Sequence, residues 1–158
     1  LKDNLFKELK KNKIDGLIIV DLPYVESEEF LKKLNEEGVD LIRLISPTTT
    51  DERISKILAS SSGYLYYISL KGVTGSDLKV SEELEQRVSK IKKQTNLPVV
   101  VGFGIKDAET ANKMSKCSDG VVVGSKLVDE ISKHPSIEDN LLKQNLTSII
   151  EDLKLGIS

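Results

Sequence analysis

Two short runs of valine, each ending in glycine, constrain the fold more than any other feature of this sequence. The first reads Pro-Val-Val-Val-Gly-Phe-Gly-Ile over residues 98–105, and the second reads Asp-Gly-Val-Val-Val-Gly-Ser over residues 119–125. Neither run alternates apolar with polar residues, so each predicts a strand buried on both faces, as in a parallel sheet covered by helices. A helix start follows each run directly. We therefore expect a parallel sheet built from βα units.

The glycines at these two strand ends predict an anion site. Gly102 and Gly104 end the first run, and Gly124 ends the second, just before Ser125. Glycine lets a ligand approach bare backbone, and the start of the next helix offers N–H groups and a positive dipole end, which together suit phosphate. In a (β/α)₈ barrel the loops after strands seven and eight usually hold the phosphate, which is the placement we expect here. The alternative is that these glycines only allow tight βα turns.

Five strand patterns alternate with helical patterns along the chain. Strands are predicted at 15–21, 40–46, 64–70, the first valine run and 120–123. Helices are predicted at 3–13, 28–37, 81–93 and 125–131. Three more begin at caps: one at the capping box of Thr49 and Glu52, one after Asp107, and one after Ser136 that runs to about 154. The last is expected to bury Leu142, Leu146, Ile149, Ile150 and Leu153. Strict alternation with short loops predicts right-handed crossovers in one domain over residues 1–158.

Composition excludes several classes of function. The net charge is −2 with acids and bases interspersed, so no basic stripe indicates nucleic acid binding and no polybasic block indicates a membrane surface. No apolar run is long enough to span a bilayer and no signal-peptide pattern opens the sequence, so we expect a cytoplasmic protein. The single cysteine, Cys117, and the single histidine, His134, form no metal-ligand cluster. We interpret Cys117 as a small helix-end or core residue rather than a nucleophile, and His134 as an exposed loop residue.

Five motifs in order make a resemblance specific. They are Asp-Gly-Leu-Ile-Ile-Val-Asp-Leu-Pro from Asp15, Ile-Ser-Pro-Thr-Thr-Thr-Asp-Glu-Arg-Ile from Ile45, Tyr-Tyr-Ile-Ser-Leu-Lys-Gly-Val-Thr-Gly from Tyr66, and the two valine runs. Together they resemble the tryptophan synthase alpha chain over essentially the whole sequence. The resemblance implies a (β/α)₈ TIM barrel that cleaves indole-3-glycerol phosphate to indole and glyceraldehyde 3-phosphate by a retro-aldol reaction without a cofactor. It also implies a partner in a heterotetramer, the pyridoxal-phosphate-dependent beta chain that receives the indole.

The resemblance also assigns site residues. Those implied to bind substrate are Tyr66, Thr74, Gly75, Phe103, Gly104, Gly124 and Ser125, of which Gly75, Gly104, Gly124 and Ser125 meet the phosphate and Thr74 lies on the loop that closes over substrate. Tyr66 as a barrel-filling residue is an equal alternative to Tyr66 in contact with the ligand. Asp21 and Pro23 are implied to lie toward the beta chain, although the position of Asp21 at a strand end would also suit an acid or base.

The catalytic half of the family's site has no counterpart here. The family's glutamate and aspartate belong to its second strand and the loop after it, and neither motif occurs in this sequence. Retro-aldol cleavage needs one group that protonates the indole ring carbon and another that accepts a proton, so the chain is expected to carry the phosphate half alone. Two other readings stay open: a different phosphate-binding barrel, such as a phosphoribosyl-anthranilate isomerase or ribulose-phosphate epimerase relative, and a non-catalytic module that binds a phosphorylated ligand or docks on a beta chain.

Five strands, corresponding to the family's fourth through eighth, do not close a barrel. The strands at Leu17 and Val121 are therefore expected to present open edges, and the apolar interior to be wet. A longer native protein, a separate fragment or pairing of two copies would cover them. We favour a longer protein, because Leu1 lies in what reads as the middle of a helix.

Overall fold

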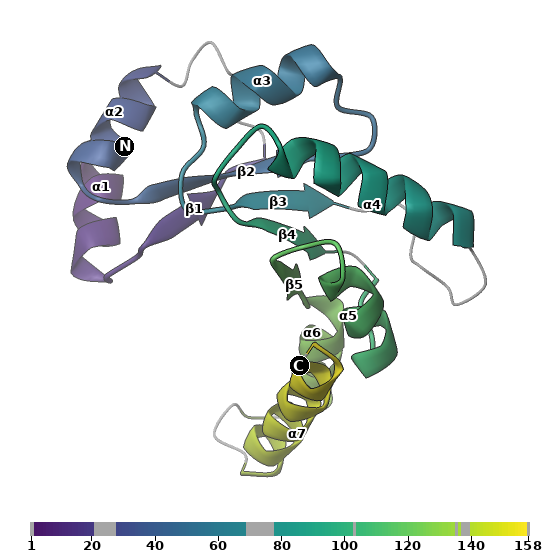
Figure 1. The fold of residues 1–158 in the computed structure, drawn as a ribbon. Helices are drawn as coiled ribbons and strands as arrows, with labels where there is room; N and C mark the ends of the chain where they lie inside the picture. The colour runs from purple at the N-terminus through teal and green to yellow at the C-terminus, as the bar shows by residue number, and fades with distance from the viewer. Residues whose placement is uncertain are drawn as a thin grey trace.

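Five strands form one parallel sheet, in which their order in space, β1-β2-β3-β4-β5, is their order along the chain (Figure 1). The computed structural model describes residues 2–20, 28–68, 78–102, 104–134, 136 and 140–157. The strands are β1 (Gly16–Ile18), β2 (Asp40–Ile45), β3 (Leu65–Ile68), β4 (Val99–Gly102) and β5 (Gly120–Val122). The helices are α1 (Lys2–Lys11), α2 (Glu28–Glu36), α3 (Asp51–Ala59), α4 (Leu78–Lys92), α5 (Ala108–Ser115), α6 (Ser125–Ser132) and α7 (Asn140–Gly156). The predicted alternation of strands and helices is confirmed.

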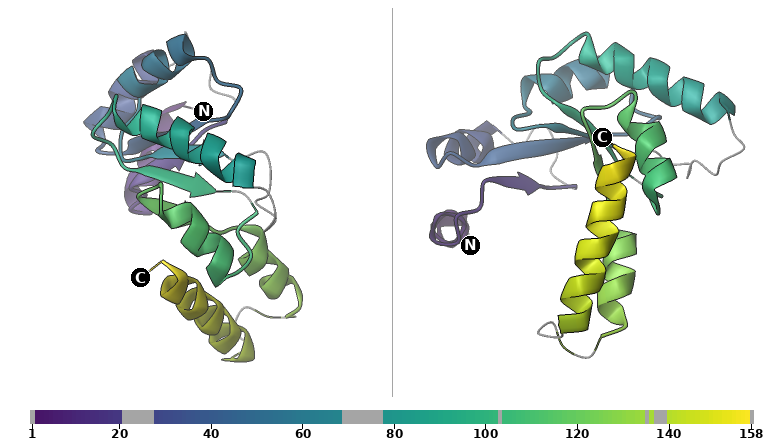
Figure 2. Two further views of the ribbon diagram at one scale, coloured as in Figure 1. Left: turned by 45° about the vertical axis from the view of Figure 1, so that its right-hand side comes forward. Right: turned by 60° about the horizontal axis from the view of Figure 1, so that its bottom comes forward.

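Successive side chains of each strand point to opposite faces, and only one face carries the main core. The principal core cluster holds Ile45, Leu65, Tyr67, Val99 and Val101 from the strands, packed against residues of α3, α4 and α5. A smaller cluster beside β1 and β2 packs Leu41 against α1 and α2. Helices α2, α3 and α4 lie on one side of the sheet, and the carboxyl-terminal helices α5, α6 and α7 group together at its β5 end (Figure 2).

The sheet ends at β1 on one side and β5 on the other, so two parallel edges lack a neighbouring strand among the described residues. Ile18 at the β1 edge is 45% exposed and Val20, just beyond it, is 72% exposed, and every residue of β5 is only half-buried. An open parallel edge with wet apolar side chains is unusual, because parallel sheets normally have both faces covered. This confirms the expectation of an incomplete barrel.

Helix starts differ from the sequence expectation at two places. The capping box of Thr49 and Glu52 is wrong, because α3 is capped by Thr50, whose hydroxyl accepts the Arg53 N–H, while the Thr49 hydroxyl accepts the Ser46 N–H at 3.0 Å. Helix α4 begins at 78 rather than 81. Three adjacent threonines offer three possible caps, and the local turn geometry decides among them. By contrast, the cap at Asp107 is confirmed as part of a capping box with Thr110.

Two expectations of burial in the last third of the chain are also wrong. Ile150 is 46% exposed, whereas Leu142 and Leu153 of the same helix are buried as expected. His134 is not an exposed loop residue, because its side chain is only 9% exposed and its Nε2 lies 3.4 Å from Glu130 Oε1. The turn at the end of α6 folds the imidazole back onto the helix, which its position before a proline in the sequence does not reveal. Helix α7 begins at Asn140, and the residues between it and Ser136 lie outside the described part of the chain.

Among the described residues, no helix has both the length and the apolar character needed to cross a bilayer.

Candidate functional site

The carboxyl ends of β3, β4 and β5 meet at one edge of the sheet. The parallel register pairs Ile68 with Gly102 and Gly102 with Val122, so the last residues of the three strands lie side by side. Loops that follow these ends carry Gly104 and Gly124, one βα unit apart. The expected juxtaposition of the two glycine-bearing strand ends is therefore present.

Tyr66 belongs to β3, and its ring extends over Gly102 of the neighbouring strand β4, on the face of the sheet opposite the main core. A Cβ atom placed on Gly102 would lie 2.5 Å from Tyr66 Cε2 and 2.8 Å from Tyr66 Cζ, so only glycine leaves room for the ring. The ring is half-buried, and this burial raises the pKa of the phenol above its usual value, with a smaller contribution from Tyr64. A neutral hydroxyl can both donate and accept a hydrogen bond. The packing on Gly102 agrees with Tyr66 as a filling residue, and its contact with a ligand stays a prediction.

Gly104 adopts a backbone conformation that favours glycine. Its φ of 74° lies in the left-handed region, which most L-residues avoid at a cost of about 1–2 kcal/mol. The residue is half-buried between the end of β4 and the Asp107 cap of α5, and the next residue, Ile105, is buried in the core. The chain thus turns sharply at Gly104 with its backbone unshielded by a side chain.

Helix α6 begins at Ser125 with its first turn open. Gly124 occupies the cap position, makes no side-chain cap hydrogen bond, and would tolerate a Cβ without any contact within 4 Å. Its carbonyl accepts the N–H groups of Leu127 and Val128 at 3.0 and 3.1 Å, as expected for the start of a helix. Gly124 and Ser125 are exposed, and no acidic residue lies in the first turn. A helix start of this kind presents N–H donors and a positive dipole end to an anion.

The other assigned site residues lie outside the described part of the chain. These are Thr74, Gly75 and Phe103 of the substrate-binding set, and Asp21 and Pro23 of the expected interface. Their roles therefore stay predictions.

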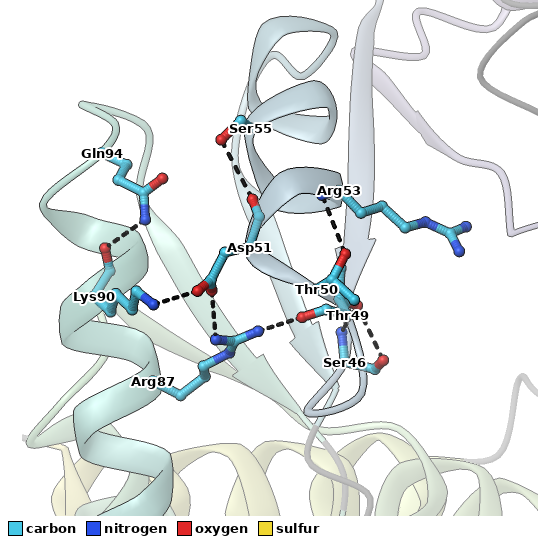
Figure 3. Close-up of polar contacts among 9 residues, drawn as sticks. All are labelled: Ser46, Thr49, Thr50, Asp51, Arg53, Ser55, Arg87, Lys90 and Gln94. Atoms are coloured by element: carbon cyan, nitrogen blue, oxygen red, sulfur yellow. Dashed lines mark hydrogen bonds and ion pairs between the residues drawn. The ribbon is translucent and has the colours of Figure 1, made fainter.

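A polar network at the neighbouring strand end was not anticipated from the sequence. The turn after β2 links the hydroxyls of Ser46, Thr48 and Thr49, and Asp51 at the start of α3 pairs with Arg87 and Lys90 of α4 (Figure 3). The hydrogen bond from Lys90 is the largest cause that lowers the pKa of the Asp51 carboxyl, followed by that from Arg87. The run of three threonines after a strand was the available signal, but it does not reveal a partner on a helix more than thirty residues away.

The remaining reactive side chains have structural surroundings. Cys117 is half-buried against the core, its thiol lies 3.4 Å from the Met114 carbonyl, and burial raises the pKa of the thiol. This confirms it as a small residue at the helix end. Within the described ranges, no three His, Cys, Asp or Glu side chains gather closely enough to hold a metal ion.

Comparison with known proteins identifies the family. The profile described as "Tryptophan synthase alpha chain" matches residues 1–156. Tryptophan synthase alpha chains from Marinobacter nauticus and Aromatoleum aromaticum are 45% and 38% identical to this chain, over 89% and 94% of it and over 52% and 54% of their own lengths. The chain thus spans about half the length of the curated relatives it matches.

Solved structures agree with the sequence comparisons. Tryptophan synthase subunit alpha from Legionella pneumophila superposes with a TM-score of 0.81 at 33% identity, covering 99% of this chain and 56% of that one. The tryptophan synthase A-subunit from Pyrococcus furiosus superposes with a TM-score of 0.77 at 32% identity, covering 96% of this chain and 59% of that one. From the collinear match over nearly every residue and the shared sheet, we conclude that the chain belongs to the tryptophan synthase alpha chain family.

Proposed function

We propose that this chain provides the phosphate-binding half of a tryptophan synthase alpha-type lyase, which cleaves indole-3-glycerol phosphate to indole and glyceraldehyde 3-phosphate. The observation that carries the proposal is the adjacency of two bare strand ends. Gly104 turns the chain in the left-handed region after β4, and α6 opens after Gly124 without a side-chain cap. Both places expose backbone N–H groups where a phosphate oxygen could accept hydrogen bonds.

The substrate would lie across three strand ends. We assign its phosphate to Gly75, Gly104, Gly124 and Ser125, and its indole-bearing part to the side of Phe103 and Tyr66. Thr74 belongs to the loop proposed to close over the bound molecule and exclude water. Phosphate held by backbone amides needs no cofactor, and each charge-assisted hydrogen bond contributes about 1.5–3 kcal/mol.

Proton transfer is assigned to residues outside this sequence. The family's catalytic glutamate and aspartate have no counterpart among residues 1–158, so this half would bind and orient the substrate while other residues move the protons. We further propose that the surface near Asp21 and Pro23 faces a tryptophan synthase beta chain, in a cytoplasmic heterotetramer. A chain that binds the phosphate but carries no proton-transfer groups would also suit a second function. In that case it would be a module that binds a phosphorylated ligand without turnover.

The proposal is tested by replacing Gly104 and measuring affinity for glycerol 3-phosphate by calorimetry. Gly104→Val places a branched side chain where the phosphate oxygens would meet the backbone, and we expect the affinity to fall more than tenfold, because one or two charge-assisted hydrogen bonds are lost. The matched control is Gly38→Val, since Gly38 also has a positive φ, 68°, and lies at the end of α2, away from the strand ends.

The control separates strain from ligand contact. Both variants carry the cost of a branched residue in the left-handed region, so a loss of affinity common to both would indicate general destabilisation. An unchanged dissociation constant for Gly104→Val would move the phosphate site elsewhere. Incubation with indole-3-glycerol phosphate adds a second test. Indole release by this chain alone would reject the binding module and would place proton-transfer groups within residues 1–158, whereas binding without turnover is expected of both functions.

A further inference from the structure

The turn that follows β2 lies at the same edge of the sheet as the proposed phosphate site. The register pairs Leu44 with Tyr66, so these two side chains share the face opposite the main core, and Ser46 lies two residues after Leu44 at the start of the turn. Ser46 follows the last residue of β2 directly and is half-buried. Because β2 and β3 are neighbours in the sheet, the turn that Ser46 begins lies beside the carboxyl end of the strand that carries Tyr66.

Hydroxyl groups organise this turn internally. Ser46 Oγ lies 2.9 Å from Thr48 Oγ1 and 3.1 Å from Thr49 Oγ1, and the Ser46 N–H donates to Thr49 Oγ1. A hydroxyl has one donor hydrogen and two acceptor lone pairs, so the Ser46 hydroxyl can keep a partner within the turn and also hydrogen-bond a polar ligand. The orientation of Ser46 depends on where Thr49 is held.

Arg87 of α4 holds Thr49 from outside the turn (Figure 3). One end of its guanidinium, Nη2, donates to the Thr49 carbonyl, and the other, Nη1, donates to Asp51 Oδ1 at 2.8 Å. Lys90, one turn along α4, donates to the other Asp51 oxygen. The forked geometry of arginine allows it to bridge a backbone carbonyl and a carboxylate at once, which a lysine ammonium does less well.

The energetics of Arg87 favour positioning over stability alone. The Asp51 side chain is 57% exposed and that of Lys90 is 52% exposed, and ion pairs in such surroundings add little to stability. The Arg87 side chain is only 22% exposed, and its Nε is buried without a hydrogen-bond partner in the described part of the chain. A buried donor without a partner lowers the stability of the folded protein, and the exposed ion pairs of Arg87 add little to offset that cost. A gain in stability alone therefore does not explain why an arginine lies here.

We propose that Arg87 is a positioning residue for the ligand site, and that the turn it fixes presents the Ser46 hydroxyl to the glycerol part of the phosphorylated ligand. This inference rests on the proposed function, because it adds a second wall to the same site. The phosphate would be held at β4 and β5 and the polyhydroxyl chain would lie toward β2. Arg87 itself touches no substrate and acts only through Thr49 and Asp51.

The test combines hydrogen–deuterium exchange of the turn with calorimetric titration of glycerol 3-phosphate. In Arg87→Leu we expect faster exchange at the Ser46 amide and an affinity about tenfold lower, since a displacement of site groups by about 1 Å can cost that much or more. Arg87→Lys should recover part of the affinity, because it keeps one of the two bonds. Ser46→Ala should lower the affinity while the amide at position 46 keeps its slow exchange, because its N–H still donates to Thr49 Oγ1.

Arg53→Leu is the matched control, because it removes an exposed guanidinium from α3 while keeping the backbone N–H that binds Thr50. It should leave exchange and affinity unchanged. Faster exchange in Arg87→Leu with unchanged affinity would overturn the inference and leave the phosphate site standing, and unchanged exchange would overturn it as well. If the unmodified chain binds no glycerol 3-phosphate, the proposed function fails and the inference fails with it.

Discussion

Replacing Gly102 by alanine probes the contact that sets Tyr66 at the strand ends. The new Cβ would lie 2.5 Å from Tyr66 Cε2 and 2.8 Å from Cζ, distances that real Cβ contacts essentially never show, so the ring has to move. Overpacking of this kind costs about 1–3 kcal/mol. Because Tyr66 is only half-buried and the sheet is open on that face, the ring can rotate outward, and we expect a loss in the free energy of unfolding of about 1 kcal/mol.

Gly120→Ala is the matched control on the same face of the neighbouring strand. A Cβ there would meet only Val100 Cγ1, at 3.4 Å, so the substitution should be close to neutral. Urea unfolding followed by circular dichroism measures both variants. In a Tyr66→Ala background the cost of Gly102→Ala should disappear, because the ring that it strikes is gone, and this non-additivity isolates the contact.

The same displacement should weaken binding if Tyr66 contacts the ligand. Glycerol 3-phosphate lacks the indole part of the substrate, so titration with indole-3-glycerol phosphate is the sharper assay for Tyr66, which we propose lies beside that part. Equal stability of the Gly102→Ala and Gly120→Ala proteins would show that the Tyr66 ring does not limit space at Gly102. An undiminished cost of Gly102→Ala in the Tyr66→Ala background would show the same.

Two further predictions concern the carboxyl-terminal helices. The pKa of Glu130 is lowered to about 2, first by the hydrogen bond from Lys133 and then by those from Asn145 and His134. The ionised carboxylate therefore stabilises the folded protein fully above its ordinary pKa of 4.5, and this stabilisation is lost as the pH falls toward 2. Thermal unfolding of Glu130→Gln should therefore depend less on pH in that window than unfolding of the unmodified chain, and parallel curves would contradict the assignment. Gly156→Ala would bring a Cβ within 2.9 Å of the Ala108 backbone, which cannot rotate away as a side chain can. The substitution should therefore lower the free energy of unfolding by about 1–3 kcal/mol. An unchanged free energy of unfolding in urea would show that α7 can shift on α5.

The order of strands and helices could be predicted from the sequence because the signals are local. Apolar runs such as 99–101, the cap at Asp107 and the glycine at the end of α2 each involve residues close in the chain. Short connections between such elements leave few topologies, and the parallel sheet in sequence order is the expected one. The open edges also followed from counting strands.

The parts of the site that depend on distant residues could not be predicted in the same way. The two strand ends with Gly104 and Gly124 were found because glycine next to a helix start is a local pattern. The contact of Arg87 with Asp51 joins residues 36 apart, and periodicity on α4 indicates only that Arg87 lies near the edge of the buried face. The contact of His134 with Glu130 likewise depends on the geometry of the turn after α6, for which the sequence carries no clear pattern.

We expect the bare backbone at the ends of β4 and β5 to bind the phosphate of the ligand, and a crystal structure of the protein with glycerol 3-phosphate tests this binding directly. The phosphate should lie beside Gly104, Gly124 and Ser125 and should accept hydrogen bonds from backbone N–H groups at the start of α6. A phosphate bound at any other place on the protein, with this edge of the sheet empty, would contradict it.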